Sequence, residues 1–228
     1  MTKNIERQIA HLKEMLLTLG GLVEKSVGEA IRAMESRNVE LAEQVIRQDD
    51  EIDAMEVKIE EECLNTLALY NPVASDVRYV VAVLTINKDL ERVGDLAVSL
   101  AEETKFLAND PPIQQAPFEL VDEGQQVRQM LKDCLDALGH RDTTLARKVL
   151  RADDRVDRIH REMYRKIKEA IRQNPLESGR FIELLNTSRH LERIADHAVN
   201  IAEDVIYVVE GRIVRHRPES RSEPQSEE

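Results

Sequence analysis

The chain has few of the residues that mark secreted disulfide-rich domains, zinc modules or aromatic-rich β folds. Among its 228 residues there is no Trp, and there are only two Cys, three Phe, four Tyr, eight Gly and seven Pro. The isolated Cys63 and Cys134 form no C-x-x-C motif, which favours idle thiols in a reducing compartment over disulfides or metal ligands. The scarcity of glycine, proline and aromatic residues favours a nearly all-helical fold.

Long apolar runs and a surplus of basic residues are also missing. No stretch reaches the length of a membrane span, and the opening MTKNIERQIAHLKEMLLTLGG lacks the pattern of a signal peptide. The 32 basic and 44 acidic residues give a formal net charge of −12, which disfavours direct nucleic-acid binding because that needs a basic face. We therefore expect a cytoplasmic protein that is not inserted into the membrane.

The apolar spacing predicts long bundle helices. Near the N-terminus, apolar residues alternate at steps of four and three: Ile5, Ile9, Leu12, Leu16, Leu19, Val23 and Val27. This helix should end near residues 36–38, and the pattern predicts further helices over about 39–70, 74–107, 118–139, 142–173 and 178–210. Asn-Pro pairs at 71–72 and 174–175 interrupt the pattern, because proline disfavours a helical residue before it.

The chain also repeats itself. LERVGDLAVSLAEE at residue 90 returns as LERIADHAVNIAED at residue 191, with eight of fourteen positions identical. The proline-rich segment 108–117 separates the two halves. We therefore predict an all-α protein of two tandem, sequence-related three-helix bundles. These are residues 1–107 and 118–211, followed by a disordered polar tail over 212–228.

Each half carries two acidic pairs with a spacing of four residues. These are Asp49/Asp53 and Glu91/Asp95 in the first half, and Asp153/Asp157 and Glu192/Asp196 in the second. A spacing of four places both carboxylates of a pair on one face of a helix, where like charges repel. A chain this acidic contains several such pairs by chance, so their position is more informative than their number.

The two predicted hairpins place the pairs at the same level. Asp53 and Glu91 are equally far along the chain from Pro72, and so are Asp49 and Asp95. The four acids of the second half are likewise centred on the junction between Asn174 and Pro175. Since both arms of an antiparallel hairpin rise equally per residue, each half should bring four carboxylates together.

Four converging carboxylates repel one another, so their negative charge must be compensated. Three kinds of compensation are possible. Nearby bases could form salt bridges with them: Lys88, Arg92, Arg155, Arg158, Arg189 and Arg193. The carboxylates could share protons, or they could bind a multivalent cation, which the duplicated register favours. The predicted ligands are Asp49, Asp53, Glu91, Asp95, Asp153, Asp157, Glu192 and Asp196.

Carboxylate ligands favour hard ions such as Mg²⁺, Mn²⁺, Ca²⁺ or ferric iron, and zinc is less favoured without His or Cys. His160 lies three residues after Asp157 on the same stripe, where the first half has Glu56. A lone histidine of this kind is more often structural than a ligand. Glu102 and Glu203, two turns further along, could join the acidic groups.

With these motifs, the chain resembles the PhoU family of accessory regulators of phosphate uptake. The resemblance is carried by NPVASDVR at 71–78, LERVGD at 90–95, LERIADHAVNIAE at 191–203 and the duplication. It implies two three-helix bundles and metal clusters, of iron or of Mg²⁺ or Mn²⁺, held by the paired E(D)xxxD motifs. The second half departs from this pattern at two places. It has IAD at 194–196, where the first half ends in GD, and its turn reads NPLESGR, without the PVASDVR signature of the first turn.

The resemblance further implies a cytoplasmic, often homodimeric protein that represses the phosphate-starvation response. Its implied partners are the ATPase of the phosphate-specific ABC transporter and the phosphate-sensing histidine kinase. The chain has no Gly-rich phosphate loop and no G-x-S-x-G motif, which favours a regulator over an enzyme. The alternatives are a ferritin-like di-metal enzyme or iron store, which needs Glu-x-x-His motifs absent here, and a purely structural bundle without metal.

Overall fold

Six long helices form the part of the chain that the computed structural model describes, residues 2–70, 72–113 and 120–214. Their bounds are α1 Thr2–Ser36, α2 Val39–Tyr70, α3 Ala74–Ala108, α4 Leu120–His140, α5 Thr143–Gln173 and α6 Ser178–Glu210. A short 3-10 turn, η1 Pro175–Glu177, precedes α6. The predicted helices are confirmed with ends that differ by one or two residues, while the predicted start of the fourth helix at residue 118 and residues 114–117 of the predicted linker lie outside the described residues. The expected disorder of the tail concerns mainly residues 215–228, which lie outside the described residues.

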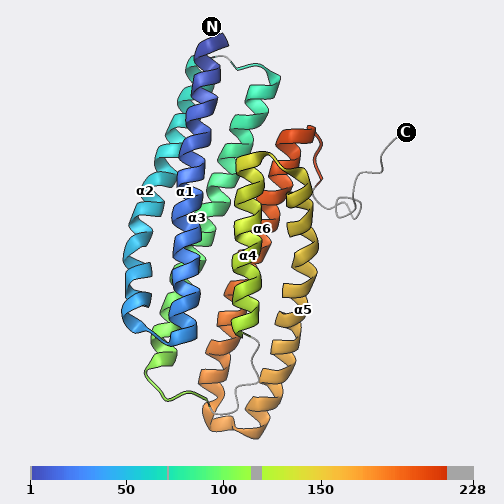
Figure 1. The fold of residues 1–228 in the computed structure, drawn as a ribbon. Coiled ribbons are helices and arrows are strands. Elements are labelled where there is room, and N and C mark those ends of the chain that lie inside the picture. Colours follow the sequence, from blue (N-terminus) through green and yellow to red (C-terminus); the bar gives the residue numbers. More distant parts are fainter. Residues whose placement is uncertain (1, 71, 114–119, 215–228) are drawn as a thin grey trace, which may run out of the picture.

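The helices form two bundles that lie side by side (Figure 1). Helices α1, α2 and α3 pack against one another, and α4, α5 and α6 do the same. Helix α3 also packs along α6, and α1 packs against α4. The predicted all-α fold of two three-helix bundles is thus confirmed, and no strand occurs within the described ranges.

Both bundles use the same turn after their first helix. Arg37 and Arg141 adopt left-handed backbone conformations, with φ of 53° and 55°. The next residue then donates a backbone hydrogen bond into the last helical turn, Asn38 to Ala33 and Asp142 to Ala137, as in a Schellman motif. The side chain of this residue also caps the following helix, since Asn38 Oδ1 accepts from the Leu41 amide and Asp142 Oδ1 accepts from two amides of α5.

An arginine from each bundle holds the connecting segment in place. The Arg37 guanidinium donates to the carbonyl oxygens of Leu107 and Asp110. Arg180, near the start of α6, donates to the Pro111 carbonyl and lies 3.8 Å from Asp110 Oδ2. These contacts satisfy carbonyl groups in the last turn of α3 and just beyond it, where no further helical turn can do so.

Apolar seams bury the interior of both bundles. The predicted seam of α1 is confirmed, since Leu12, Leu16, Leu19, Val23 and Val27 are all buried. Cys63 and Cys134 are buried and free, and burial raises the pKa of the Cys63 thiol to about 12, so these thiols are poorly reactive at neutral pH.

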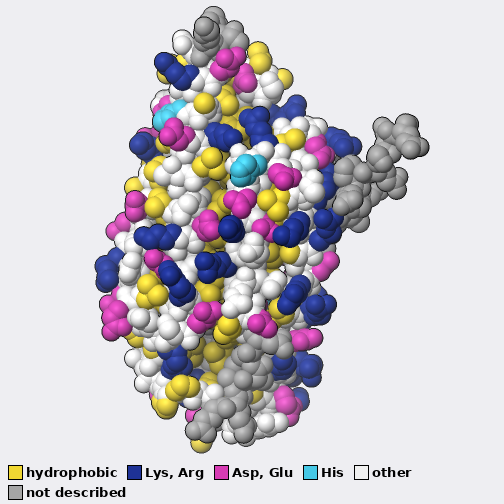
Figure 2. Space-filling view, in the orientation of Figure 1, with side chains coloured by type: hydrophobic (Ala, Val, Ile, Leu, Met, Phe, Trp, Pro, Cys, Tyr) yellow, Lys and Arg dark blue, Asp and Glu magenta, His cyan; other side chains and the backbone are white. Residues whose placement is uncertain are grey.

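The outer surface is polar and of mixed charge. Figure 2 shows basic and acidic side chains intermixed on one face, without a continuous basic stripe. No helix in the described part of the chain combines the length and the apolarity needed to cross a membrane.

Candidate metal centre

The first acidic quartet lies where α2 and α3 run antiparallel. Asp49 and Asp53 come from α2, and Glu91 and Asp95 come from α3. Burial raises the pKa of Asp49 to about 6, with further contributions from the charges of Asp53, Asp95 and Glu91. The predicted register therefore brings these four carboxylates into one electrostatic group.

Asp49 is the most constrained member of this quartet. Its Oδ1 is buried and has no hydrogen-bond partner within the described residues. A Cβ added to Gly94 would lie 3.2 Å from this oxygen and 3.1 Å from Ile52 Cγ2. The absence of a side chain at position 94 thus makes the space into which Asp49 points. A buried acceptor without a donor costs free energy, which a bound cation would recover.

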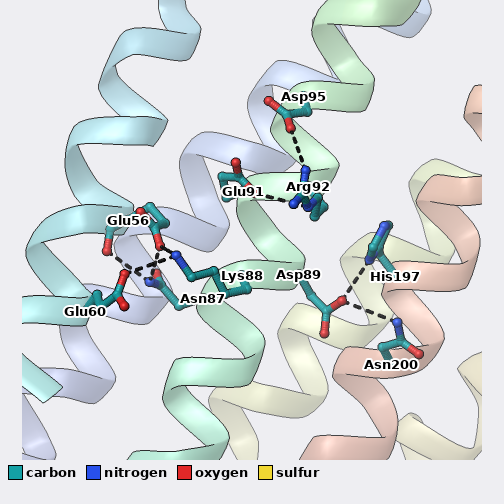
Figure 3. Close-up of polar contacts among 10 residues, drawn as sticks. All are labelled: Glu56, Glu60, Asn87, Lys88, Asp89, Glu91, Arg92, Asp95, His197 and Asn200. Atoms are coloured by element: carbon teal, nitrogen blue, oxygen red, sulfur yellow. Dashed lines mark hydrogen bonds and ion pairs between the residues drawn. The ribbon is translucent and has the colours of Figure 1, made fainter. Parts of the chain in front are cut away.

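The neighbouring bases compensate this quartet only in part. Arg92 lies 3.7 Å from Glu91 Oε2 and 3.5 Å from Asp95 Oδ2, and its side chain is 61% exposed. Lys88 points away, because its Nζ lies 2.5 Å from Glu56 Oε1 and 3.1 Å from Glu60 Oε2 (Figure 3). The pKa of Glu91 stays above its ordinary value, owing to burial and to Asp95, although Arg92 acts to lower it. An exposed pair of this kind contributes about 0–1 kcal/mol, so salt bridging leaves much of the repulsion in place.

The second quartet lies at the corresponding place between α5 and α6. Burial, followed by the charges of Asp157 and Asp153, raises the pKa of Glu192. Burial, Glu192 and Asp157 likewise raise the pKa of Asp196. Arg161 lies 3.4 Å from Asp157 Oδ2, and this contact also provides only partial compensation.

The carboxylates of each quartet lie near enough to affect one another electrostatically, but they do not converge on a single point. Within the described residues, no three Asp, Glu, His or Cys side chains are grouped tightly enough to hold an ion as they stand. Mutual repulsion favours such spreading. Asp53 and Asp196 are exposed, so both quartets open to solvent.

A third acidic group joins the two bundles and was missed in the sequence. Glu103 of α3 interacts with Glu183 of α6, and its Oε1 lies 3.9 Å from His190 Nε2. Its contacts are made between helices far apart in sequence, so no local spacing could identify it. About four turns earlier on α3, Asp89 accepts a hydrogen bond from Asn200 Nδ2 of α6 and lies 2.8 Å from His197 Nδ1 (Figure 3).

The chain matches the family model described as PhoU domain twice, over residues 16–104 and 120–205. These two ranges coincide with the two helical bundles. Each acidic quartet falls within one match.

Curated relatives extend the similarity over nearly the whole chain. A phosphate-specific transport system accessory protein PhoU homolog of Aquifex aeolicus is 38% identical over 212 residues, covering 92% of this chain and 95% of the relative. One of the same name from Pseudomonas putida is 38% identical over 220 residues, covering 95% and 86%.

Solved structures agree in fold. The crystal structure of PhoU from Pseudomonas aeruginosa superposes with a TM-score of 0.88 at 37% identity, covering 91% of this chain and 99% of that one. The phosphate transport system regulatory protein PhoU from Streptococcus pneumoniae gives a TM-score of 0.82 at 28% identity, covering 92% and 99%.

Proposed function

Because the chain belongs to the PhoU family, we propose that it is a non-enzymatic regulator of phosphate uptake and phosphate-responsive signalling. The observation that carries this proposal is the similarity of both bundles, in sequence and in fold, to proteins named as accessory proteins of phosphate-specific transport systems. The protein represses the phosphate-starvation response from the cytoplasm. It does so as a homodimer that contacts the ATPase subunit of the phosphate ABC transporter and the phosphate sensor histidine kinase.

Long bundle helices with mixed charge suit this docking role. The first hairpin presents exposed apolar side chains at and after the start of α3, with Val73, which precedes the helix, 67% and Val81 46% exposed. Exposed apolar side chains rimmed by polar residues are typical of protein contact surfaces.

The two acidic quartets are the metal-binding part of the proposal. The residues fit such ions, because the buried Asp49 Oδ1 has no donor and the donors of both quartets are carboxylate oxygens, which hard cations prefer. Asp49, Asp53, Glu91 and Asp95 would hold one ion or cluster. The second set is Asp153, Asp157, Glu192 and Asp196. When bound, the metal supplies positive charge that locks the α2–α3 and α5–α6 hairpins.

A genetic experiment tests the regulatory role. Deletion of the gene should raise expression of a phosphate-responsive reporter in phosphate-rich medium, and expression of the intact chain should restore repression. Reporter activity that is unchanged by the deletion would contradict the proposal. Pull-down of the transporter ATPase and the sensor kinase at high and low phosphate tests the two partners separately, and light scattering of the purified protein tests the dimer.

Metal binding needs its own test. Protein purified without affinity-tag metals is dialysed against Mn²⁺ or ferric iron and its metal content is measured. A variant with Asp49→Ala and Glu91→Ala should lose the metal of the first quartet. Asp50→Ala is the matched control, since Asp50 is the exposed neighbour of Asp49. Equal metal content and equal melting of all three proteins would show that the first quartet binds no metal.

A further inference from the structure

The outer face of α5 carries a ridge of basic side chains. Exposed bases follow one another along this helix at steps of three and four residues, which places them on one face. We call this set the α5 stripe: Arg151, Arg155, Arg158, Arg161, Arg165, Lys168 and Arg172. At a rise of about 1.5 Å per residue, the stripe is about 32 Å long.

No other helix covers the α5 stripe. In the described part of the chain, α5 packs only against α4, α6 and the short η1 turn, and it forms the outer flank of the second bundle (Figure 1). The face shown in Figure 2 meets this flank only at its edge, where basic side chains are frequent. The exposed acids of α5 are fewer than its bases: Asp154, Glu162 and Glu169. The flank is therefore positive, although the whole chain has a formal net charge of −12.

Contacts within the protein use these bases only weakly. Arg161 lies 3.4 Å from Asp157 Oδ2 and Arg172 lies 3.4 Å from Glu169 Oε2, with the two arginine side chains 69% and 66% exposed. The remaining members, apart from Arg151, form no ion pair with any residue that the structure describes: Arg155, Arg158, Arg165 and Lys168. These guanidinium and ammonium groups are available to an external anion.

The duplicated fold does not require bases at these positions. When Asp49 of α2 is aligned with Asp153 of α5, the matching positions of α2 are all exposed as well. Only one of them is basic, and the others are acidic or apolar: Arg47, Glu51, Ala54, Val57, Glu61, Leu64 and Ala68. The stripe is thus a property of the second bundle alone.

The composition of the stripe indicates lipid phosphates as its ligand. Most of its bases are arginines, whose planar guanidinium groups bind phosphate oxygens in pairs. Protein interfaces are instead depleted of charge at their centre and rich in aromatic side chains, whereas Tyr164, 58% exposed, is the only large apolar side chain exposed on α5. Tyrosine is frequent at the level of membrane headgroups. A straight ridge also fits a flat surface better than the curved phosphate paths of a duplex.

The acidic remainder of the chain does not prevent such a contact. Charges more than a Debye length away, about 8 Å in physiological salt, are largely screened. Helix α2, with its acidic outer positions, lies on the opposite flank from α5, and other helices stand between them (Figure 1). Each helix is about 10 Å thick, so the charges of α2 act little on a surface that α5 touches.

We propose that the α5 stripe binds the anionic phospholipid surface of a membrane, with α5 parallel to the bilayer plane. The ligands are the phosphate groups of acidic lipid headgroups. This is a contact with the surface, and no helix in the described part of the chain could cross the bilayer. The inference rests on the proposed function only for the location, since a regulator of a membrane transporter works beside this surface.

Co-sedimentation of the purified full-length protein with vesicles tests the inference. Vesicles of equal parts phosphatidylglycerol and phosphatidylcholine should bind the protein, and vesicles of phosphatidylcholine alone should not. Binding to the acidic vesicles should fall about tenfold or more between about 0.05 M and about 0.5 M NaCl, because salt screens the attraction.

A triple variant identifies the surface that binds. Arg158→Gln, Arg165→Gln and Lys168→Gln together should weaken binding to the acidic vesicles at least about tenfold, since each base near such a surface contributes about fivefold. The matched control removes three exposed bases of α1 and α2, has the same net charge and should bind like the wild type: Arg7→Gln, Lys25→Gln and Lys58→Gln. Circular dichroism melting should show that both variants fold like the wild type.

Equal binding of the triple variant and its control to the acidic vesicles overturns the inference, and so does a wild type that does not sediment with them. Equal binding to both kinds of vesicle would show that lipid charge is not recognised and overturns it too. If the wild type binds a DNA duplex but not the acidic vesicles, the stripe is a nucleic-acid site and the lipid assignment is wrong. The reporter test of repression is independent of all these results, so the proposed function is judged separately.

Discussion

The carboxyl pair between the bundles makes stability depend on pH in a defined direction. Burial, followed by a hydrogen bond with Glu183 and the charge of that residue, raises the pKa of Glu103 from 4.5 to about 8. An acid whose pKa rises on folding contributes stability below its unfolded pKa and loses it as the pH rises through the folded pKa. The bundle interface should therefore weaken progressively as the pH rises from about 4.5 to about 8.

The size of the effect follows from the same values. A pKa that moves from 4.5 to about 8 corresponds to at most about 5 kcal/mol between the two protonation states. The side chain is 17% exposed, so water reduces this figure. We expect a loss of about 2 kcal/mol in the free energy of unfolding between about pH 6 and about pH 9.

Glu103→Gln tests this reasoning, because glutamine keeps a donor for Glu183 but cannot ionise. The difference in stability between the variant and the wild type should grow in favour of the variant by about 2 kcal/mol from about pH 6 to about pH 9. Urea unfolding followed by circular dichroism, with a chelator present, gives both values. Glu61→Gln, at an exposed position of α2, is the control. If wild type and Glu103→Gln lose stability in parallel as the pH rises, the carboxyl pair does not act as described.

Three further substitutions probe other parts of the structure. Gly94→Val should displace the Asp49 carboxylate and destabilise the protein by about 1–3 kcal/mol through crowding, with weaker Mn²⁺ binding in the first quartet; unchanged Mn²⁺ affinity would argue against the role of the glycine. Asp142→Ala removes the N-cap of α5 and should cost about 1 kcal/mol in urea unfolding, whereas an unchanged midpoint would show that the cap is dispensable. Leu90→Ala, at a fully buried position of α3, should cost about 2–5 kcal/mol in thermal unfolding, and a smaller loss would mean that the cavity collapses.

It was predictable from the sequence that the acids on the two arms of each hairpin lie opposite one another, because helical geometry is local. The two arms of a hairpin rise equally per residue, so the distances of Asp49 and Asp95 from Pro72 were enough to place them opposite one another. The partners of the bases were not predictable. Lys88 is three residues before Glu91 and yet binds Glu56 and Glu60 of α2, because the direction of a long side chain depends on which neighbouring helix offers an acceptor.

The sequence by itself determined six helices, their turns, the duplication and the two sets of four acids, since all of these follow from periodicity and spacing along one chain. Only the tertiary structure decided that the bundles lie side by side, that Glu103 meets Glu183, and that Asp89 meets Asn200. These contacts join helices whose relative rotation depends on the packing of the whole core, which no single helix encodes. Two quartets that are equivalent in sequence thereby acquire different surroundings in the folded protein.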